Sequence, residues 1–145
     1  MAKRETGSTL GLLLETNVLL DVVLERSPWA ADAALVLDAI SRGIARGFMA
    51  GHAVTTVYYV VEKEVGRAAA NTAVADLLEL LGVVAIGAAE FQRALAMGLS
   101  DFEDAVQAAA CLTAGADHVV TRNAKDYKGA PVSTLTPGEV LASLA

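Results

Sequence analysis

The stretch Leu12-Leu13-Leu14-Glu15-Thr16-Asn17, near the start of the chain, is an apolar run that ends in three polar residues. Such a run before a polar turn is typical of a strand that is buried on both faces. From Val18 to Leu24 the apolar spacing becomes that of a helix, which Pro28 would break. This change predicts the first strand–helix unit of an α/β fold, with polar side chains at the carboxyl end of the strand.

The rest of the chain repeats this alternation of strands and helices. Short apolar runs predict strands, and apolar positions three and four residues apart predict helices between them. We expect further strands at Gly47–Ala50, Val83–Ile86, His118–Thr121 and Val132–Leu135. We expect further helices at Trp29–Ile40, Ala53–Lys63, Ala68–Leu81, Ala88–Met97 and Ser100–Ala114, and a last one capped by Thr136. The pattern predicts a three-layer α/β/α fold with a central, mostly parallel sheet of four or five strands.

The length and composition indicate one globular domain. A chain of 145 residues fits a single domain, and no repeat, low-complexity segment or linker divides residues 1–145. Hydrophobic residues make up 54% of the chain and charged residues 19%, which argues against disorder. So large an apolar share predicts that some apolar surface is left for a partner to cover.

The charge, the cysteine content and the hydropathy restrict the class of protein further. A net charge of −6 argues against binding nucleic acid through a broad basic face, but it allows an enzyme whose carboxylates bind metal ions. The single cysteine, Cys111, lies in an Ala-rich run and is expected to be buried and reduced. The longest uncharged stretch, Gly47–Val61, is shorter than a membrane span. We therefore expect a soluble, cytoplasmic protein.

Carboxylates gather where the predicted strands end or helices begin. Glu15 follows the first strand, and Asp126 follows the strand that ends at Thr121. Asp101 and Asp104 lie three residues apart at the start of a helix and therefore on one of its faces. In an open α/β sheet, ligands bind outside the carboxyl ends of the strands. The four acids are therefore candidates for a common site.

Some of the acids at the start of the helix Ser100–Ala114 have a structural explanation. Ser100 and Glu103 have the spacing of a capping box, and the helix dipole favours an acid at Asp101. Asp104 lies beyond this cap on a helix whose sequence is largely apolar. A carboxylate in that position needs a partner or a metal ion, which predicts a site role for Asp104.

Other catalytic patterns are missing from the sequence. His52 and His118 share no zinc-ligand spacing, and no serine or cysteine stands in an elbow motif that would indicate a catalytic triad. Neither of the common glycine-rich phosphate loops occurs. Asp21, one helical turn beyond Asn17, is expected to be solvated or structural. The acids at the strand ends are therefore the strongest candidates.

Three segments of the chain are LLETNVLLD at 13–21, DFEDAVQAA at 101–109 and VTRNAKDY at 120–127. Together they resemble the PIN-domain family, which includes the VapC-like toxins of bacterial toxin–antitoxin pairs. Each match is short, but the three occur in the order of the family and span nearly the whole chain. The resemblance implies a doubly wound parallel sheet and endoribonuclease activity.

The resemblance also implies which acids are catalytic. Carried over by position, Glu15, Asp101, Asp104 and Asp126 would be the catalytic carboxylates of a metal-dependent ribonuclease. Glu15, Asp104 and Asp126 would bind Mg²⁺ or Mn²⁺, which are hard ions that prefer oxygen ligands. Such ions activate water, here for the hydrolysis of RNA phosphodiesters.

Neutral residues occupy several family positions around these acids. Thr16 and Asn17 would orient the first carboxylate, as groups behind a ligand do. Asn123 stands where many relatives have a fourth aspartate, and Thr56 stands where toxin relatives have an acid. The first acid is itself a glutamate where the family has aspartate. The resemblance therefore implies a metal site with less negative charge than is usual.

The resemblance and the nearby charges also suggest partners. Arg122, Lys125 and Lys128 would hold flanking phosphates of an RNA substrate, or would be solvated surface charges. A VapC-like toxin implies a cognate antitoxin and a two-fold homodimer. The helix faces at Trp29–Ile40 or Val54–Val61 are candidates for the dimer contact.

The leading interpretation is a metal-dependent endoribonuclease that is the toxin of a toxin–antitoxin pair. The alternative is a PIN-fold binding protein whose metal site is degenerate and weakly active or inactive. A phosphoacceptor regulatory domain of the flavodoxin-like kind would need an aspartate at the end of the third strand, where Ile86-Gly87-Ala88 supplies none.

Overall fold

The computed structural model describes residues 9–145, and a five-stranded parallel sheet lies at its centre. In chain order the strands are β1 (Leu10–Leu14), β2 (Ala45–Ala50), β3 (Gly82–Val84), β4 (His118–Val120) and β5 (Thr134–Leu135). Their order in the sheet is β3-β2-β1-β4-β5, and every neighbouring pair is parallel. The predicted α/β fold with its parallel sheet is confirmed. Residues 1–8 of the predicted domain 1–145 lie outside the described part of the chain.

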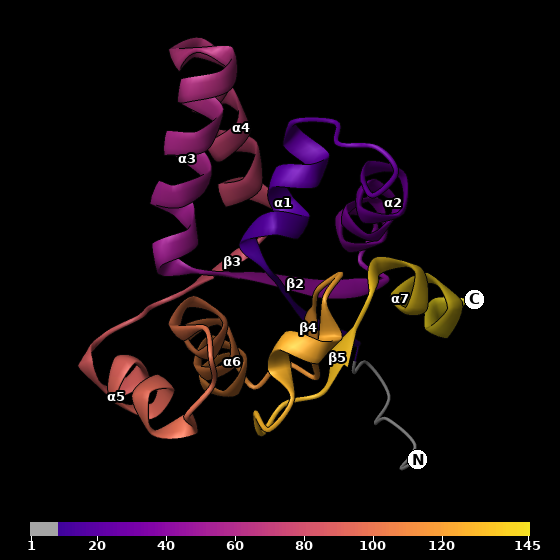
Figure 1. Cartoon of the computed structure of the whole chain (residues 1–145). Coiled ribbons are helices and arrows are strands. Elements are labelled where there is room, and N and C mark those ends of the chain that lie inside the picture. The colour runs from indigo at the N-terminus through magenta and orange to yellow at the C-terminus, as the bar shows by residue number, and fades with distance from the viewer. Residues whose placement is uncertain (1–8) are drawn as a thin grey trace.

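Helices cover both faces of this sheet (Figure 1). They are α1 (Thr16–Val23), α2 (Ala30–Ser41), α3 (Gly51–Val65), α4 (Arg67–Leu80), α5 (Ala88–Met97), α6 (Phe102–Ala114) and α7 (Pro137–Leu144). Helices α1 to α4 pack together on one face, with α7 against α2. Helix α6 lies on the other face against β1, β2 and β4, and α5 packs on α6. None of the helices in residues 9–145 is long and apolar enough to cross a membrane.

The position of β1 in the middle of the sheet decides where its carboxyl end lies. Leu12, Leu13 and Leu14 are fully buried, since β2 and β4 flank the strand and helices cover both of its faces. Leu14 is paired with Val120 at the end of β4. The backbone N–H of Glu15 continues this pairing by donating to the Val120 carbonyl at 3.2 Å. Glu15 therefore lies beside the chain that leads from β4 to Asp126.

The start of α6 differs from the sequence prediction. Asp101, and not Ser100, is the N-cap, because its side chain accepts a hydrogen bond of 3.1 Å from the backbone N–H of Asp104. The predicted capping box from Ser100 to Glu103 is therefore wrong, and Glu103 contacts His52 instead. An aspartate cap satisfies a free N–H and also places its charge at the positive end of the helix dipole.

Other local predictions hold with small shifts. The capping box of Thr136 and Glu139 is present at the start of α7, and Cys111 is buried. The sequence pattern predicts no helix directly after β4, but Ala124–Tyr127 forms one turn of 3₁₀ helix, named η1. This turn contains Asp126 and buries Tyr127 toward the sheet.

Candidate active site

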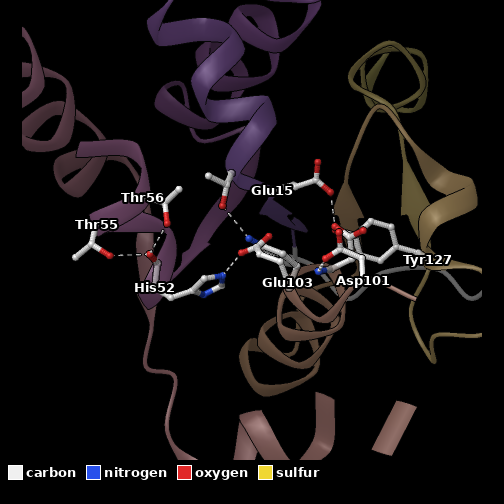
Figure 2. A network of polar contacts seen from close by, with 10 residues as sticks. Glu15, His52, Thr55, Thr56, Asp101, Glu103 and Tyr127 are labelled. Atoms are coloured by element: carbon white, nitrogen blue, oxygen red, sulfur yellow. Dashed lines mark hydrogen bonds and ion pairs between the residues drawn. The ribbon is translucent and has the colours of Figure 1, made fainter. Parts of the chain in front are cut away.

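Glu15 is the buried acid at the centre of the candidate site. Its side chain is only 4% exposed, because it stands between the end of β1 and the start of α1 under the η1 segment. The hydroxyl of Tyr127 donates to Glu15 Oε2 at 2.5 Å (Figure 2). This bond joins the end of the first strand to the end of the 3₁₀ turn, two segments far apart in the sequence.

Burial raises the pKa of the Glu15 carboxyl above its ordinary value, although hydrogen bonds from Tyr127 and Thr121 act in the opposite direction. The nearby charges of Glu103 and Asp126 raise this pKa further. The pKa of the Tyr127 phenol is raised as well, first by burial and then by Glu15. The phenol therefore stays protonated and acts as the hydrogen-bond donor.

Asp104 lies in the first turn of α6 and faces the other acids. Burial is the main reason why its pKa rises from 3.8 to about 7. Repulsion by four other carboxylates adds to this rise; they are those of Asp101, Glu15, Asp126 and Glu103. The fold thus brings together the acids that the sequence placed at strand ends and helix starts, from β1, α6 and η1.

Thr16 and Gln107 form a buried polar contact behind the acids. The Gln107 side-chain amide donates to the Thr16 hydroxyl at 2.9 Å, and both side chains are buried. Gln107 Oε1 has no hydrogen-bond partner within residues 9–145. The neighbouring residue Asn17 is exposed, so of the two residues predicted to orient Glu15, only Thr16 is held inside.

His52 and Glu103 form an ion pair across the site, from the first turn of α3 to the first turn of α6 (Figure 2). The hydroxyls of Thr55 and Thr56 both donate to the His52 backbone carbonyl, at 3.0 and 3.3 Å. Sequence reasoning missed this pair, because it treated His52 as isolated and Glu103 as part of a cap. Only the position of both residues at helix starts could have indicated it.

Arg122 lies close to the site but is held by other groups. Its guanidinium donates to both carboxylate oxygens of Asp21, at 2.9 and 3.2 Å, and stacks 3.9 Å from the ring centre of Trp29. Asp21 is 1% exposed and also faces Arg26 at 3.7 Å. Of the two roles predicted for Asp21, the structural one therefore applies and the solvated one is wrong.

The other predicted residues lie on the exposed segment after β4. Asn123, Lys125, Asp126 and Lys128 are all exposed, whereas Tyr127 between them is buried. The backbone N–H of Asn123 donates to the Thr121 hydroxyl at 3.1 Å, which fixes the chain as it leaves β4. Asp126 thus stands at the surface, near enough to Glu15 and Asp104 for its charge to raise their pKa values.

The donor set suits a hard divalent cation, since carboxylate and amide oxygens are the ligands that Mg²⁺ and Mn²⁺ prefer. The raised pKa of Asp104 reflects burial and neighbouring carboxylates, and Gln107 Oε1 has no hydrogen-bond partner in residues 9–145, so the site has acceptor oxygens that are not satisfied. Within residues 9–145, however, no three acidic, histidine or cysteine side chains are placed so that they could hold an ion as they stand. The residues therefore fit such a cation in chemistry and charge, while their side chains would have to move closer together to surround one.

Comparison with solved structures finds this fold in bacterial toxin–antitoxin complexes. A chain in the crystal structure of VapBC2 from Rickettsia felis, bound to a DNA fragment from its promoter, has a TM-score of 0.70 and 14% identity, over 88% of this chain and 98% of that chain. A chain of the DNA-bound VapBC from Salmonella typhimurium gives 0.70 and 15%, over 89% and 99%. VapC20 from Mycobacterium tuberculosis, described as a Sarcin-Ricin loop cleaving toxin, gives 0.65 and 14%, over 81% and 93%.

These identities are low, so the structural matches establish the fold and nothing finer. A search of curated proteins gives no match. The sequence profile of the PIN domain, in contrast, matches residues 11–125, which include all of β1 after Leu10, all of α6 and the start of η1. This chain therefore belongs to the PIN-domain family.

Proposed function

We propose that the protein is a metal-dependent endoribonuclease and the toxin of a toxin–antitoxin pair. The observation that supports this proposal is that Glu15, Asp104 and Asp126, with Asp101 beside Asp104, lie near enough for their charges to interact at the carboxyl edge of a parallel sheet. No arginine or lysine of residues 9–145 forms an ion pair with Glu15 or Asp104. Members of the PIN family are nucleases, which agrees with an acidic site of this kind.

Glu15, Asp104 and Asp126 would hold Mg²⁺ or Mn²⁺ in this proposal. A bound ion would lower the pKa of water and offset the charge of a phosphodiester group. Asp101 keeps Asp104 in place, because its carboxylate accepts the Asp104 backbone N–H. Burial of Glu15 and Tyr127 keeps bulk water away from one side of the site, so that charges there act more strongly on one another.

Neutral residues would shape the acidic site in this proposal. Thr16 fixes the chain next to Glu15 through its bond to Gln107. Thr56 supports α3 at His52, and Asn123 supports the start of the η1 segment. Asn17 is exposed and stays a candidate for contact with substrate rather than with Glu15.

Lys125 and Lys128 are the cations best placed to meet the phosphates of an RNA substrate. Both are exposed, and both flank Asp126 in the η1 segment. Arg122 was predicted for the same role, but its ion pair with buried Asp21 favours a structural role. Because the protein as a whole is acidic, these two lysines would act locally and not as part of a basic face.

An antitoxin would have an apolar groove to bind. The groove has a volume of about 610 Å³ and lies between α1, α2, α3 and α4; residues lining it include Val22, Val23, Leu37, Val61, Val65 and Leu77. Such a groove suits the apolar face of a helix from a partner. The similar structures from Rickettsia felis and Salmonella typhimurium are complexes of a VapB with a VapC. We therefore assign this groove to a cognate antitoxin.

A homodimer also belongs to the proposal, and α5 and α6 offer a contact besides the two predicted at Trp29–Ile40 and Val54–Val61. In those two segments Val36 and Val57 are buried, although Leu35 and Tyr59 are exposed. On α5 and α6, Phe91, Leu95 and Phe102 are exposed, and the rings of Phe91 and Phe102 stack at 6.3 Å. We propose this patch as the contact between two copies in the cytoplasm, and light scattering that gives a monomer at micromolar concentration would contradict it.

One observation favours the alternative of a degenerate, weakly active or inactive binding protein. The Glu15 carboxylate already accepts a hydrogen bond from Tyr127, so this oxygen is partly satisfied without a cation.

An RNA-cleavage assay with titrated Mg²⁺ and Mn²⁺ decides between the two functions. The parent chain should cleave only with metal, and Asp104→Asn should lose cleavage by about two orders of magnitude or more. Asp38→Asn, at an exposed acid on α2, is the matched control. If the parent cleaves RNA with neither ion, the ribonuclease function is contradicted and the alternative of a binding protein is favoured.

A further inference from the structure

Glu103 is a fifth acid at the candidate site, and its position depends on α3. The carboxylate of Glu103 contacts His52 Nε2; the Glu103 side chain is 47% exposed and that of His52 25% (Figure 2). His52 is in turn fixed at the start of α3, where the hydroxyls of Thr55 and Thr56 bind its carbonyl. The ion pair therefore joins the two helices that flank the site.

The carboxylate of Glu103 also acts on the buried acids. Its charge raises the pKa values of Glu15, Asp104 and Tyr127. Glu103 also directly precedes Asp104 in the first turn of α6, so its pair with His52 lies next to the acids of the site. Glu103 thus contributes to the field that would attract a cation.

Helix α3 supplies no acid of its own at this place. Its first turn contains no acidic residue, and its two glutamates, Glu62 and Glu64, lie exposed near its other end. We propose that Glu103, positioned by His52, is a further carboxylate of the cation site, so that α3 contributes to this site through a histidine that holds an acid of α6. The inference rests on the proposed function, because it names a residue of the same site.

Two buried polar atoms beside this pair support the inference. His52 Nδ1 and Gln107 Oε1 are buried and have no hydrogen-bond partner in the described residues. Gln107 lies one helical turn after Glu103 on α6 and binds Thr16, the neighbour of Glu15. Buried polar atoms without a partner are costly unless a ligand or water meets them. The unpartnered oxygen of Gln107 belongs to a side chain that reaches from the helix of Glu103 to the neighbour of Glu15, where a ligand can meet it.

Calorimetric titration of the full chain with Mn²⁺ tests this role without relying on activity. Glu103→Gln should weaken Mn²⁺ binding about tenfold, and His52→Ala should weaken it by a similar factor, as the loss of a supporting group does. The double variant should bind no more weakly than Glu103→Gln alone, because His52 acts through Glu103. His52→Gln, which can still donate an N–H to Glu103, should recover much of the affinity. Glu64→Gln, at an exposed acid of α3, is the control and should not change it.

Two outcomes separate this inference from the proposed function. If Asp104→Asn removes Mn²⁺ binding while Glu103→Gln binds as the parent does, only the role of Glu103 is overturned. If the parent itself binds no Mn²⁺, the proposed function fails together with this inference. Additive losses in the His52 and Glu103 variants would overturn the positioning role of His52, provided that thermal melts show all variants to be folded.

Discussion

Glu15 and Asp21 are both buried carboxylates of the first strand–helix unit, but their surroundings differ in charge. Asp21 is 1% exposed and receives two hydrogen bonds from Arg122, with Arg26 close by. Glu15 is 4% exposed and receives a hydrogen bond from the neutral Tyr127, while other carboxylates face it. One acid is thus neutralised within the chain, and the other is not.

The difference indicates which acid serves stability and which serves function. A buried charge is strongly unfavourable unless cations or hydrogen bonds compensate it. Asp21 has that compensation and joins α1 to the segment after β4. Glu15 has only hydrogen bonds from neutral groups, and neither Glu15 nor Asp104 pairs with a cation in residues 9–145, so the fold tolerates a site that is short of positive charge. Repulsion among these carboxylates lowers the stability of the folded protein, and a bound cation would offset that repulsion.

The largest effect on stability is expected from removing Arg122, the cation that compensates the buried charge of Asp21. Arg122→Ala would leave Asp21 buried with only the more distant Arg26, and should lower the free energy of unfolding by about 3 kcal/mol. Arg42→Ala, which breaks an exposed pair with Asp38 on α2, should cost less than about 1 kcal/mol. Urea unfolding of the three proteins measures both values. Equal effects in the two variants would show that Asp21 and Arg122 form no more than a surface pair.

A divalent cation should stabilise the protein by neutralising the acidic site, as Arg122 neutralises Asp21. At a Mn²⁺ concentration of a hundred times Kd, the parent should gain about 2.7 kcal/mol of stability. Asp104→Asn should gain much less under the same conditions, because one of its ligands is lost. Thermal melts with and without Mn²⁺, followed by addition of EDTA, measure the gain. A parent melting temperature that does not respond to Mn²⁺ would contradict a cation site.

The pH dependence of stability without metal should reveal the repulsion at Asp104. Its pKa is about 7 in the folded protein, against an ordinary value of 3.8. Between these two pH values, Asp104 is ionised in the unfolded chain but still protonated in the folded protein. Rising pH therefore favours unfolding, and the stability that the raised pKa contributes at low pH is lost as the pH passes 7. The melting temperature of the parent, relative to that of Asp104→Asn in EDTA, should therefore fall from pH 4 to pH 7 and then stay level. A difference that is constant over this range would show that Asp104 is not perturbed.

Much of the fold could be predicted from local sequence patterns. Strands that helices cover on both faces are apolar, and capping residues mark where helices begin. The run Leu12–Leu14 and the acid after it were enough to place Glu15 at the edge of the sheet. The ion pairs were not predictable. Arg122 and Asp21 are 101 residues apart, and only the side-by-side position of β1 and β4 brings them together. The same holds for Tyr127, whose contact with Glu15 depends on a 3₁₀ turn that the sequence did not indicate.

The smallest and most specific effects are expected at Glu15 itself, where the family resemblance implies aspartate. The Tyr127 hydroxyl holds Oε2 of this longer side chain at 2.5 Å, on the side of the η1 segment. Glu15→Asp should place the carboxylate too far from Tyr127 for this hydrogen bond, and the loss of the bond should cost about 1 kcal/mol of stability.

In exchange, the shorter carboxylate of Glu15→Asp is free to turn toward Asp104, so Mn²⁺ binding and cleavage should both increase by less than about tenfold. Tyr127→Phe provides the separate test, because it frees Glu15 without changing its length. It should also tighten Mn²⁺ binding, whereas Glu15→Gln should weaken it. If both Glu15→Asp and Tyr127→Phe bind Mn²⁺ no more tightly than the parent, the bond between Glu15 and Tyr127 does not compete with the cation. Tyr127 would then support Glu15 as a ligand, in the same way as His52 is proposed to support Glu103.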